Sequence, residues 1–128
     1  MNTPKLPIHE SDVPIETWYA NSDREIRGKA LSDFGGMAKV GFGILELPPG
    51  SNTKPAHFHT HEDEHLYILE GNVILHLGGR RFPLRPGSYV HFPPSQESPH
   101  FLANDSREVV RYIMVGERIK NDQVIYIE

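Results

Sequence analysis

Histidines are concentrated in one short stretch of the chain, where their side chains could bind a metal ion. Four of the eight histidines fall within nine residues, at His57, His59, His61 and His65, and Glu64 lies among them. The chain has no cysteine. A transition metal would therefore have to be held by nitrogen and oxygen ligands from His, Asp or Glu.

The spacing within this stretch predicts which of these side chains face the same way. Residues two apart in a strand project to one side, so His57 and His59 project together. A turn through residues 60–63 would start a second strand at Glu64, on which Leu66 and Ile68 share its face. These two apolar side chains belong in a core, so Glu64 is carried inward with them. Because a lone buried carboxylate is costly, we expect a cation beside it.

His100 is the candidate for a third imidazole ligand. It begins an apolar run, His100 to Ala103, directly after a loop bounded by prolines. Three neutral imidazoles and one carboxylate suit one divalent transition metal, namely Fe, Mn, Zn, Ni or Cu. They do not suit calcium, which prefers six to eight oxygen ligands. Four protein ligands on an octahedral ion would leave two positions open, as a catalytic site requires.

The other histidines of the stretch have simpler interpretations. His61 is predicted to be a solvated turn residue. Pairing His59 with His61 instead of His57 is an alternative, but it leaves Glu64 only three positions further on. His65 alternates with Glu64 and so points the other way, which favours a surface or interface role.

Tyr89 and His91 are the candidate catalytic residues, because they share one face of a predicted strand. If that face is inward, they line the pocket and could transfer protons, since histidine titrates near neutral pH. If it is outward, they cover the surface or form an interface. We favour a pocket role, most of all for His91.

The elements that must position these residues are short strands. From Ala38 onward, apolar runs are separated by Gly, Pro, Asn and Asp, which predicts an all-β sandwich or barrel. The runs are Val40 to Leu47, Leu66 to Leu69, Val73 to Leu77, Arg81 to Leu84, Tyr89 to Phe92, His100 to Ala103 and Val109 to Val115. Gly78-Gly79 is typical of a two-residue hairpin loop. Residues 1–36 are predicted to be an arm packing on the barrel domain of residues 37–128, with a short hairpin around Arg24 to Leu31.

Composition narrows the possible partners. A chain of 128 residues fits one domain. Its net charge of −4 argues against a nucleic-acid partner, because a protein that binds nucleic acid needs a basic face. No apolar stretch is typical of a signal peptide or a transmembrane span. We therefore expect a cytoplasmic protein with a small-molecule ligand and no membrane partner.

The order of these residues resembles the cupin superfamily. Its first motif, G(X)5HXH(X)3,4E(X)6G, is matched by Gly50, His57, His59, Glu64 and Gly71, with six residues rather than five after Gly50. Its second motif, G(X)5PXG(X)2H(X)3N, is matched by Gly87, Pro93, His100 and Asn104. Here Ser95 stands in the place of the motif's second glycine, and four residues rather than two precede His100. The resemblance extends over residues 38–116, and it is greatest to a subgroup of small bacterial cupins.

The resemblance implies a jelly-roll barrel, or double-stranded β-helix, with His57, His59, Glu64 and His100 as metal ligands. It implies a metal-dependent enzyme of oxygenase, isomerase or decarboxylase type that acts on a small polar oxygen-bearing metabolite. The alternative is a non-catalytic cupin that binds or senses a sugar or other small molecule. A third possibility, a structural or storage role, is disfavoured by the intact ligand set. The resemblance also implies a homodimer, in which the apolar anchors of the first 20 residues and the tail Val124 to Ile127 provide contact surfaces.

Overall fold

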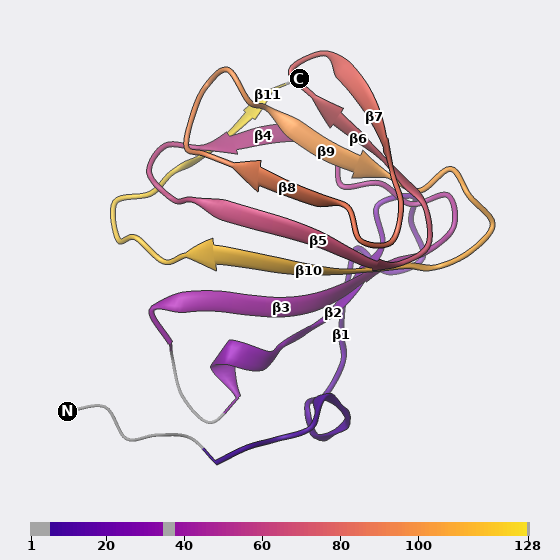
Figure 1. The fold of residues 1–128 in the computed structure, drawn as a ribbon, viewed down its shortest axis with the longest axis vertical. Coiled ribbons are helices and arrows are strands. Elements are labelled where there is room, and N and C mark those ends of the chain that lie inside the picture. The colour runs from indigo at the N-terminus through magenta and orange to yellow at the C-terminus, as the bar shows by residue number, and fades with distance from the viewer. Residues whose placement is uncertain (1–5, 35–37, 128) are drawn as a thin grey trace.

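The chain folds into two facing antiparallel sheets (Figure 1). The computed structural model describes residues 6–34 and 38–127, and within these ranges it has eleven strands and two short 3-10 helices. The strands are β1 (Glu16–Trp18), β2 (Ile26–Ala30), β3 (Val40–Leu47), β4 (Ala56–His59), β5 (Glu64–Glu70), β6 (Val73–Leu77), β7 (Arg80–Leu84), β8 (Tyr89–Phe92), β9 (His100–Ala103), β10 (Val110–Glu117) and β11 (Val124–Ile127). The 3-10 helices are η1 (Glu10–Asp12) and η2 (Leu31–Asp33). The predicted all-β class is confirmed.

The core lies between the two sheets. One sheet has the order β1-β2-β3-β10-β5-β8 and the other has the order β11-β4-β9-β6-β7. Alternate side chains of the central strands, such as β5, β6 and β9, enter the core, as the pleat requires. The buried hydrophobic residues that cluster there are Leu47, Leu66, Ile68, Val73, Leu75, Phe92, Leu102, Val110 and Tyr112. On β5 the alternation is sharp, because Leu66 and Ile68 are buried whereas Tyr67 between them is 43% exposed.

The hairpin between β6 and β7 has the predicted two-residue loop. Leu77 pairs with Arg80, so Gly78 and Gly79 form the whole connection. Their φ angles are 57° and 81°. Both values lie in the left-handed region, which glycine adopts without steric penalty and which a type I′ turn requires at both positions.

The segment before β3 is more than a covering arm. β1 pairs with β2, and β2 pairs with β3, so this segment extends the larger sheet by a hairpin. η1 is attached through Arg111, whose guanidinium lies 3.2 Å from the Glu10 carboxylate. The predicted boundary at residue 36 falls in residues 35–37, outside the described residues, and remains a prediction.

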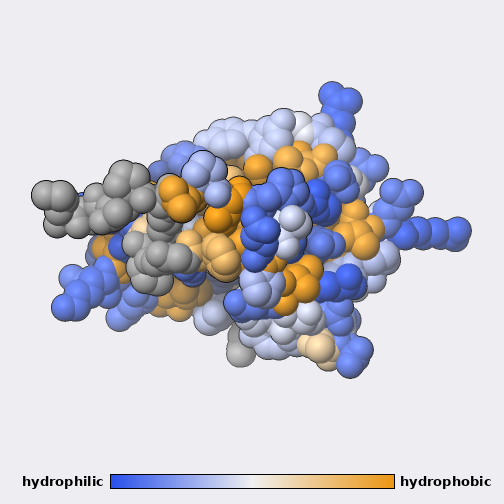
Figure 2. All heavy atoms as spheres, turned by 90° about the horizontal axis from the view of Figure 1, so that it is seen from below, coloured by the Kyte–Doolittle hydropathy of each residue, from blue (hydrophilic) through white to orange (hydrophobic). Residues whose placement is uncertain are grey.

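The C-terminal tail forms β11, which pairs with β4 of its own chain. The tail, expected from the sequence to be a dimer contact surface, thus lies along its own barrel. Several large apolar side chains remain exposed elsewhere, and Figure 2 shows hydrophobic patches among hydrophilic side chains on the face seen from below.

None of the helices in the described part of the chain has the length and apolar character needed to span a membrane.

Candidate metal centre

Two neighbouring strands bring three imidazoles together inside the barrel. β4 carries His57 and His59, and its pairing with β9 places His57 directly opposite His100. The ring centroids of His57 and His100 are 4.7 Å apart, and those of His57 and His59 are 5.6 Å apart. The stretch around residue 57 and the run at residue 100 thus converge, as the sequence predicted.

The fourth residue, Glu64, reaches this group from the opposite sheet. It starts β5 and faces inward with Leu66, which is 1% exposed. Its partner on β10 is Gly116, where a Cβ would lie only 3.4 Å from Glu64 Cγ. The Oε1 atom of Glu64 lies 3.1 Å from His59 Nε2 and 3.8 Å from His100 Nε2. The potential ligand atoms of His57, Glu64 and His100 all lie within 4.8 Å of one another, so this group could hold a metal ion.

Two buried atoms in this group have no hydrogen-bond partner. They are Glu64 Oε1, whose close neighbour His59 Nε2 at 3.1 Å is an ion-pair partner, and His100 Nε2. His100 Nδ1 lies 2.9 Å from the Ser98 carbonyl oxygen, which can only accept, so Nδ1 carries the proton. The neutral His100 ring therefore presents a lone pair from Nε2 toward a carboxylate oxygen. Two facing electron-rich atoms repel each other unless a cation lies between them. The donor set thus fits a transition metal ion.

Electrostatics divide the three histidines into two neutral rings and one charged ring. Burial, with a smaller effect of His100, lowers the pKa of His57 to about 4. Burial also lowers the pKa of His100. His59 differs, because its contact with the Glu64 carboxylate raises its pKa to about 9 despite partial burial. Burial opposes the ionisation of Glu64, but the interaction with His59 keeps the pKa of Glu64 below its usual value. In the metal-free chain, His59 and Glu64 therefore form an ion pair at neutral pH.

Asp122 supports His59 from outside the group, and the sequence analysis did not identify it. Its Oδ2 atom lies 2.7 Å from His59 Nδ1, and its Oδ1 atom accepts the backbone N–H groups of His61 and Glu62, each at 2.9 Å. A carboxylate that holds one nitrogen of a histidine leaves the other nitrogen to face a metal. Asp122 lies far along the chain from His59, between β10 and β11, so no motif could have revealed it.

Replacing Asp122 by Ala is expected to weaken metal binding although every predicted ligand is retained. The His59 ring would lose its orienting acceptor, and the turn after β4 would lose two backbone hydrogen bonds. Loss of such a support typically costs about 10- to 100-fold in affinity. Competition with a coloured chelator would measure the change. The control is Asp105→Ala, which removes an exposed carboxylate from a remote loop, and an affinity equal in both variants would contradict the supporting role.

Tyr89 and His91 lie outside the barrel, which corrects the favoured expectation that they line the pocket. They alternate on β8 with Val90 and with Phe92, which is 2% exposed and packs inward. Tyr89 is 58% exposed, and the His91 side chain is 45% exposed. Both faces of β8 carry apolar or aromatic residues, so periodicity could not decide the orientation. A catalytic role inside the barrel has no support in this placement.

The remaining two histidines of the stretch lie where the sequence predicted them. His61 is exposed in the turn after β4. His65 faces away from Glu64, with its side chain 42% exposed. Neither contributes to the group around Glu64.

A cavity of about 320 Å³ lies next to the ligand group. His57 and His100 contribute to its wall, together with the hydroxyl-bearing residues Thr53 and Tyr112. The rest of the lining is apolar: Trp18, Ile26, Leu45, Leu66, Phe92, Phe101, Leu102 and Met114. Pockets of this kind, mostly apolar with a few convergent polar groups, are where small ligands usually bind.

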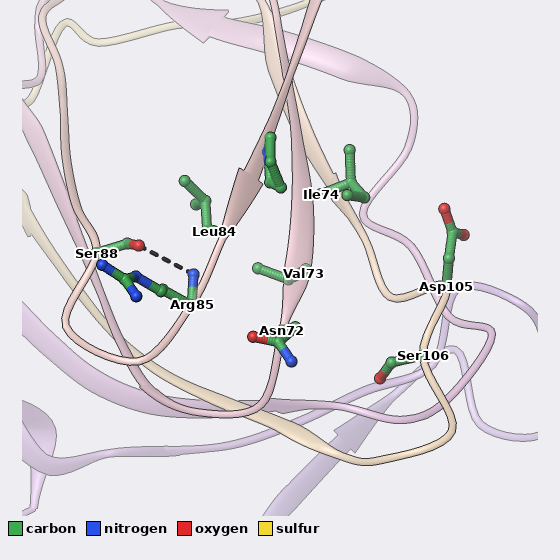
Figure 3. Close-up of a pocket in the computed structure, with 9 residues that line it drawn as sticks. Asn72, Val73, Ile74, Leu84, Arg85, Ser88, Asp105 and Ser106 are labelled. Atoms are coloured by element: carbon green, nitrogen blue, oxygen red, sulfur yellow. Dashed lines mark hydrogen bonds between the residues drawn. The ribbon is translucent and has the colours of Figure 1, made fainter.

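A larger hollow of about 570 Å³ lies at the other end of β5, beside Asn72 (Figure 3). Its lining includes Val73, Leu84 and Arg85, and the Arg85 backbone N–H donates to Ser88 Oγ at 2.9 Å. It contains none of the predicted metal ligands. Its lining offers no converging set of acidic or imidazole groups that could hold a metal ion.

Several solved structures share the fold of this chain. One is a protein from Acidithiobacillus ferrooxidans provisionally named a sugar phosphate isomerase, with 29% identity, a TM-score of 0.77 and coverage of 84% of this chain and 69% of that one. A sugar phosphate isomerase of the cupin superfamily from Silicibacter pomeroyi has 22% identity, a TM-score of 0.84 and coverage of 98% and 82%. The polyketide cyclase RemF from Streptomyces resistomycificus has 22% identity, a TM-score of 0.79 and coverage of 98% and 87%.

Sequence comparison assigns the family. No curated protein matches the chain significantly. A family model described as the cupin domain matches residues 43–116, which is more than half of the chain. This range includes all four residues of the group around Glu64. The chain therefore belongs to the cupin family.

Proposed function

We propose that this cupin is a metal-dependent enzyme whose catalytic divalent transition metal is held by His57, His59, Glu64 and His100. The observation that carries the proposal is the pair of buried, unpartnered atoms, Glu64 Oε1 and His100 Nε2, that face each other beside a cavity. Fe, Mn, Zn, Ni and Cu all accept such ligands. When bound, the metal would supply Lewis-acid polarisation of a substrate oxygen.

The cavity wall supports a substrate whose polar part is confined to one end. The sequence predicted a small polar metabolite, but side chains such as Ile26, Leu45 and Met114 offer no hydrogen bonds to a polyhydroxylated body. A bare sugar phosphate would leave its hydroxyl groups unpaired there, which is costly. A ketone or carboxylate on an aromatic or aliphatic body fits better. In this respect the cavity suits the kind of substrate that the name polyketide cyclase implies.

Two cationic side chains near His57, Arg24 and Lys54, favour a substrate with a negative charge. A third hollow, of about 190 Å³, shares His57, Ile26 and Thr53 with the apolar cavity and is also lined by Arg24 and Lys54. Arg24 Nε is buried and has no hydrogen-bond partner, while the guanidinium lies 4.4 Å from the Tyr19 ring centroid. A carboxylate entering this hollow would satisfy Arg24.

Turnover of a small-molecule panel tests the proposal. Protein loaded separately with Fe(II), Mn(II) and Zn(II) would be incubated with aromatic and aliphatic keto acids, diketones and sugar phosphates, and the products would be followed by mass spectrometry. We expect turnover of an apolar keto acid or diketone that is lost in His57→Ala. Tight binding without turnover would instead favour the alternative, a sensing cupin.

Arg24→Gln is expected to weaken binding of the best carboxylate on that panel by about 10-fold, because one charge-assisted hydrogen bond is lost. Calorimetric titration would measure the change, with metal content as a check that the centre is intact. Arg107→Gln, at an exposed site, is the matched control. Equal affinity in both variants would remove Arg24 from the site.

We also propose a homodimer in the cytoplasm. Exposed apolar side chains of the N-terminal segment and the C-terminal tail, among them Ile8, Ile15 and Val124, support association. Light scattering would measure the mass in solution.

A further inference from the structure

Three potential metal ligands gather on the outer face of the larger sheet, away from the centre around Glu64. His65 on β5 pairs directly with His91 on β8, and Asp63 immediately precedes β5. Because side chains alternate along β5, His65 points to the opposite side from Glu64. This outer cluster, Asp63, His65 and His91, therefore shares no ligand with the inner centre.

The side chains of the outer cluster converge on one point. The two imidazole rings are stacked, with centroids 4.9 Å apart and planes 13° apart. The Asp63 carboxylate faces both, with Oδ1 2.5 Å from His91 Nε2 and Oδ2 3.6 Å from His65 Nε2. The three potential ligand atoms all lie within 4.8 Å of one another. Movements of a few tenths of an ångström, which exposed side chains make freely, would bring them to metal–ligand distances of about 2 Å.

Neighbouring groups hold the outer cluster in this arrangement. The Tyr89 hydroxyl lies 2.6 Å from His65 Nδ1, so it can accept the Nδ1 proton and leave the Nε2 lone pair facing Asp63. The backbone of Asp63 is fixed on both sides by Glu117, whose side chain accepts the Asp63 N–H at 2.9 Å and whose N–H donates to the Asp63 carbonyl at 3.0 Å. Outer partners of this kind fix the tautomer and orientation of a metal-binding histidine.

We propose that Asp63, His65 and His91 form a second, surface-exposed site for a divalent transition metal. Two imidazoles and one carboxylate select Zn(II), Ni(II) or Cu(II) over Ca(II) and Mg(II). Their side chains are 35–45% exposed, so the ligands lose little solvation on binding and further coordination positions stay open to water or to an external ligand. The partial exposure also makes this site weaker than the inner centre, because water competes for the ion.

Zinc stoichiometry measured on the full chain tests the second site. Equilibrium dialysis followed by elemental analysis should find about two zinc ions per wild-type chain and about one in His65→Ala, His91→Ala and His57→Ala. The control is His76→Ala, which removes a histidine from the smaller sheet and should retain both ions. A wild-type chain that saturates at one ion, or a His91→Ala variant that still binds two, would overturn the proposal.

Copper spectroscopy gives a readout that does not depend on counting ions. In the His57→Ala background, Cu(II) should show nitrogen hyperfine structure from two imidazoles at the outer cluster. Adding His91→Ala should reduce this to one nitrogen and weaken Cu(II) binding at least about 10-fold. An unchanged spectrum after His91→Ala would place the copper elsewhere and reject the site. Circular dichroism would show that the variants keep the fold, as exposed substitutions on a sheet surface should.

Discussion

Glu64→Ala and His57→Ala proteins, purified without added metal and dialysed against a weak chelator, should contain on the order of a tenth or less of the metal in the wild-type protein. Each change removes one ligand from a group whose atoms converge within 4.8 Å. Loss of Glu64 also removes the negative charge that offsets the cation in a buried place. The weak chelator is included to empty the exposed outer cluster, so that the measurement reports the inner centre.

Two further variants make this result specific. Glu70 lies on the same strand as Glu64, but its side chain is 64% exposed and its carboxylate faces solvent. The Glu70→Ala variant should therefore leave the metal content unchanged. Glu64→Gln preserves the shape of the side chain and should lose the metal nearly as fully as Glu64→Ala, because an amide is a poorer ligand than a carboxylate. Metal content near one ion per chain in both Glu64→Ala and His57→Ala would contradict the assignment of the inner centre.

The inward position of Glu64 was predictable because local alternation and a strong apolar pattern agree there. Leu66 and Ile68 have to be buried, and the strand period then carries Glu64 inward whatever the rest of the fold does. His57 and His59 follow the same rule on their own strand. The sequence could also predict most strand limits, because Gly, Pro and Asn end each apolar run in the chain.

Features that depend on long-range pairing could not be predicted in this way. The orientation of β8 is set by its pairing with β5, which buries Phe92 and exposes Tyr89 and His91. The contact between Asp122 and His59 requires the chain to return beside β4 as β11. The outer cluster likewise depends on the register that places His65 opposite His91. Register between distant strands is decided by the whole core, so no local pattern reveals it.

Removal of the metal is expected to lower the thermal stability of the chain strongly. A ligand that binds only the folded state adds about 4 kcal/mol when its concentration is 1,000 times its dissociation constant. For a domain of this size, that corresponds to a fall in Tm on the order of 10 °C when the metal is removed. The physical reason is that only the folded chain brings the ligand atoms of His57, Glu64 and His100 within 4.8 Å of one another, so only the folded chain binds the ion tightly. Calorimetry of metal-loaded and chelator-treated protein would measure the difference.

The difference in Tm should also widen as the pH rises from 6.5 to 9. The pKa of His59 is raised from 6.5 to about 9, so in this range the metal-free folded chain retains a proton that the unfolded chain releases. Its stabilising ion pair with Glu64 is complete below pH 6.5 and is lost as the pH passes through about 9, so the metal-free protein becomes less stable. Metal binding requires His59 to lose that proton, so the affinity increases over the same range. His59→Ala should abolish this dependence, and a Tm difference that stays constant or narrows between these pH values would show that His59 is not the proton-releasing ligand.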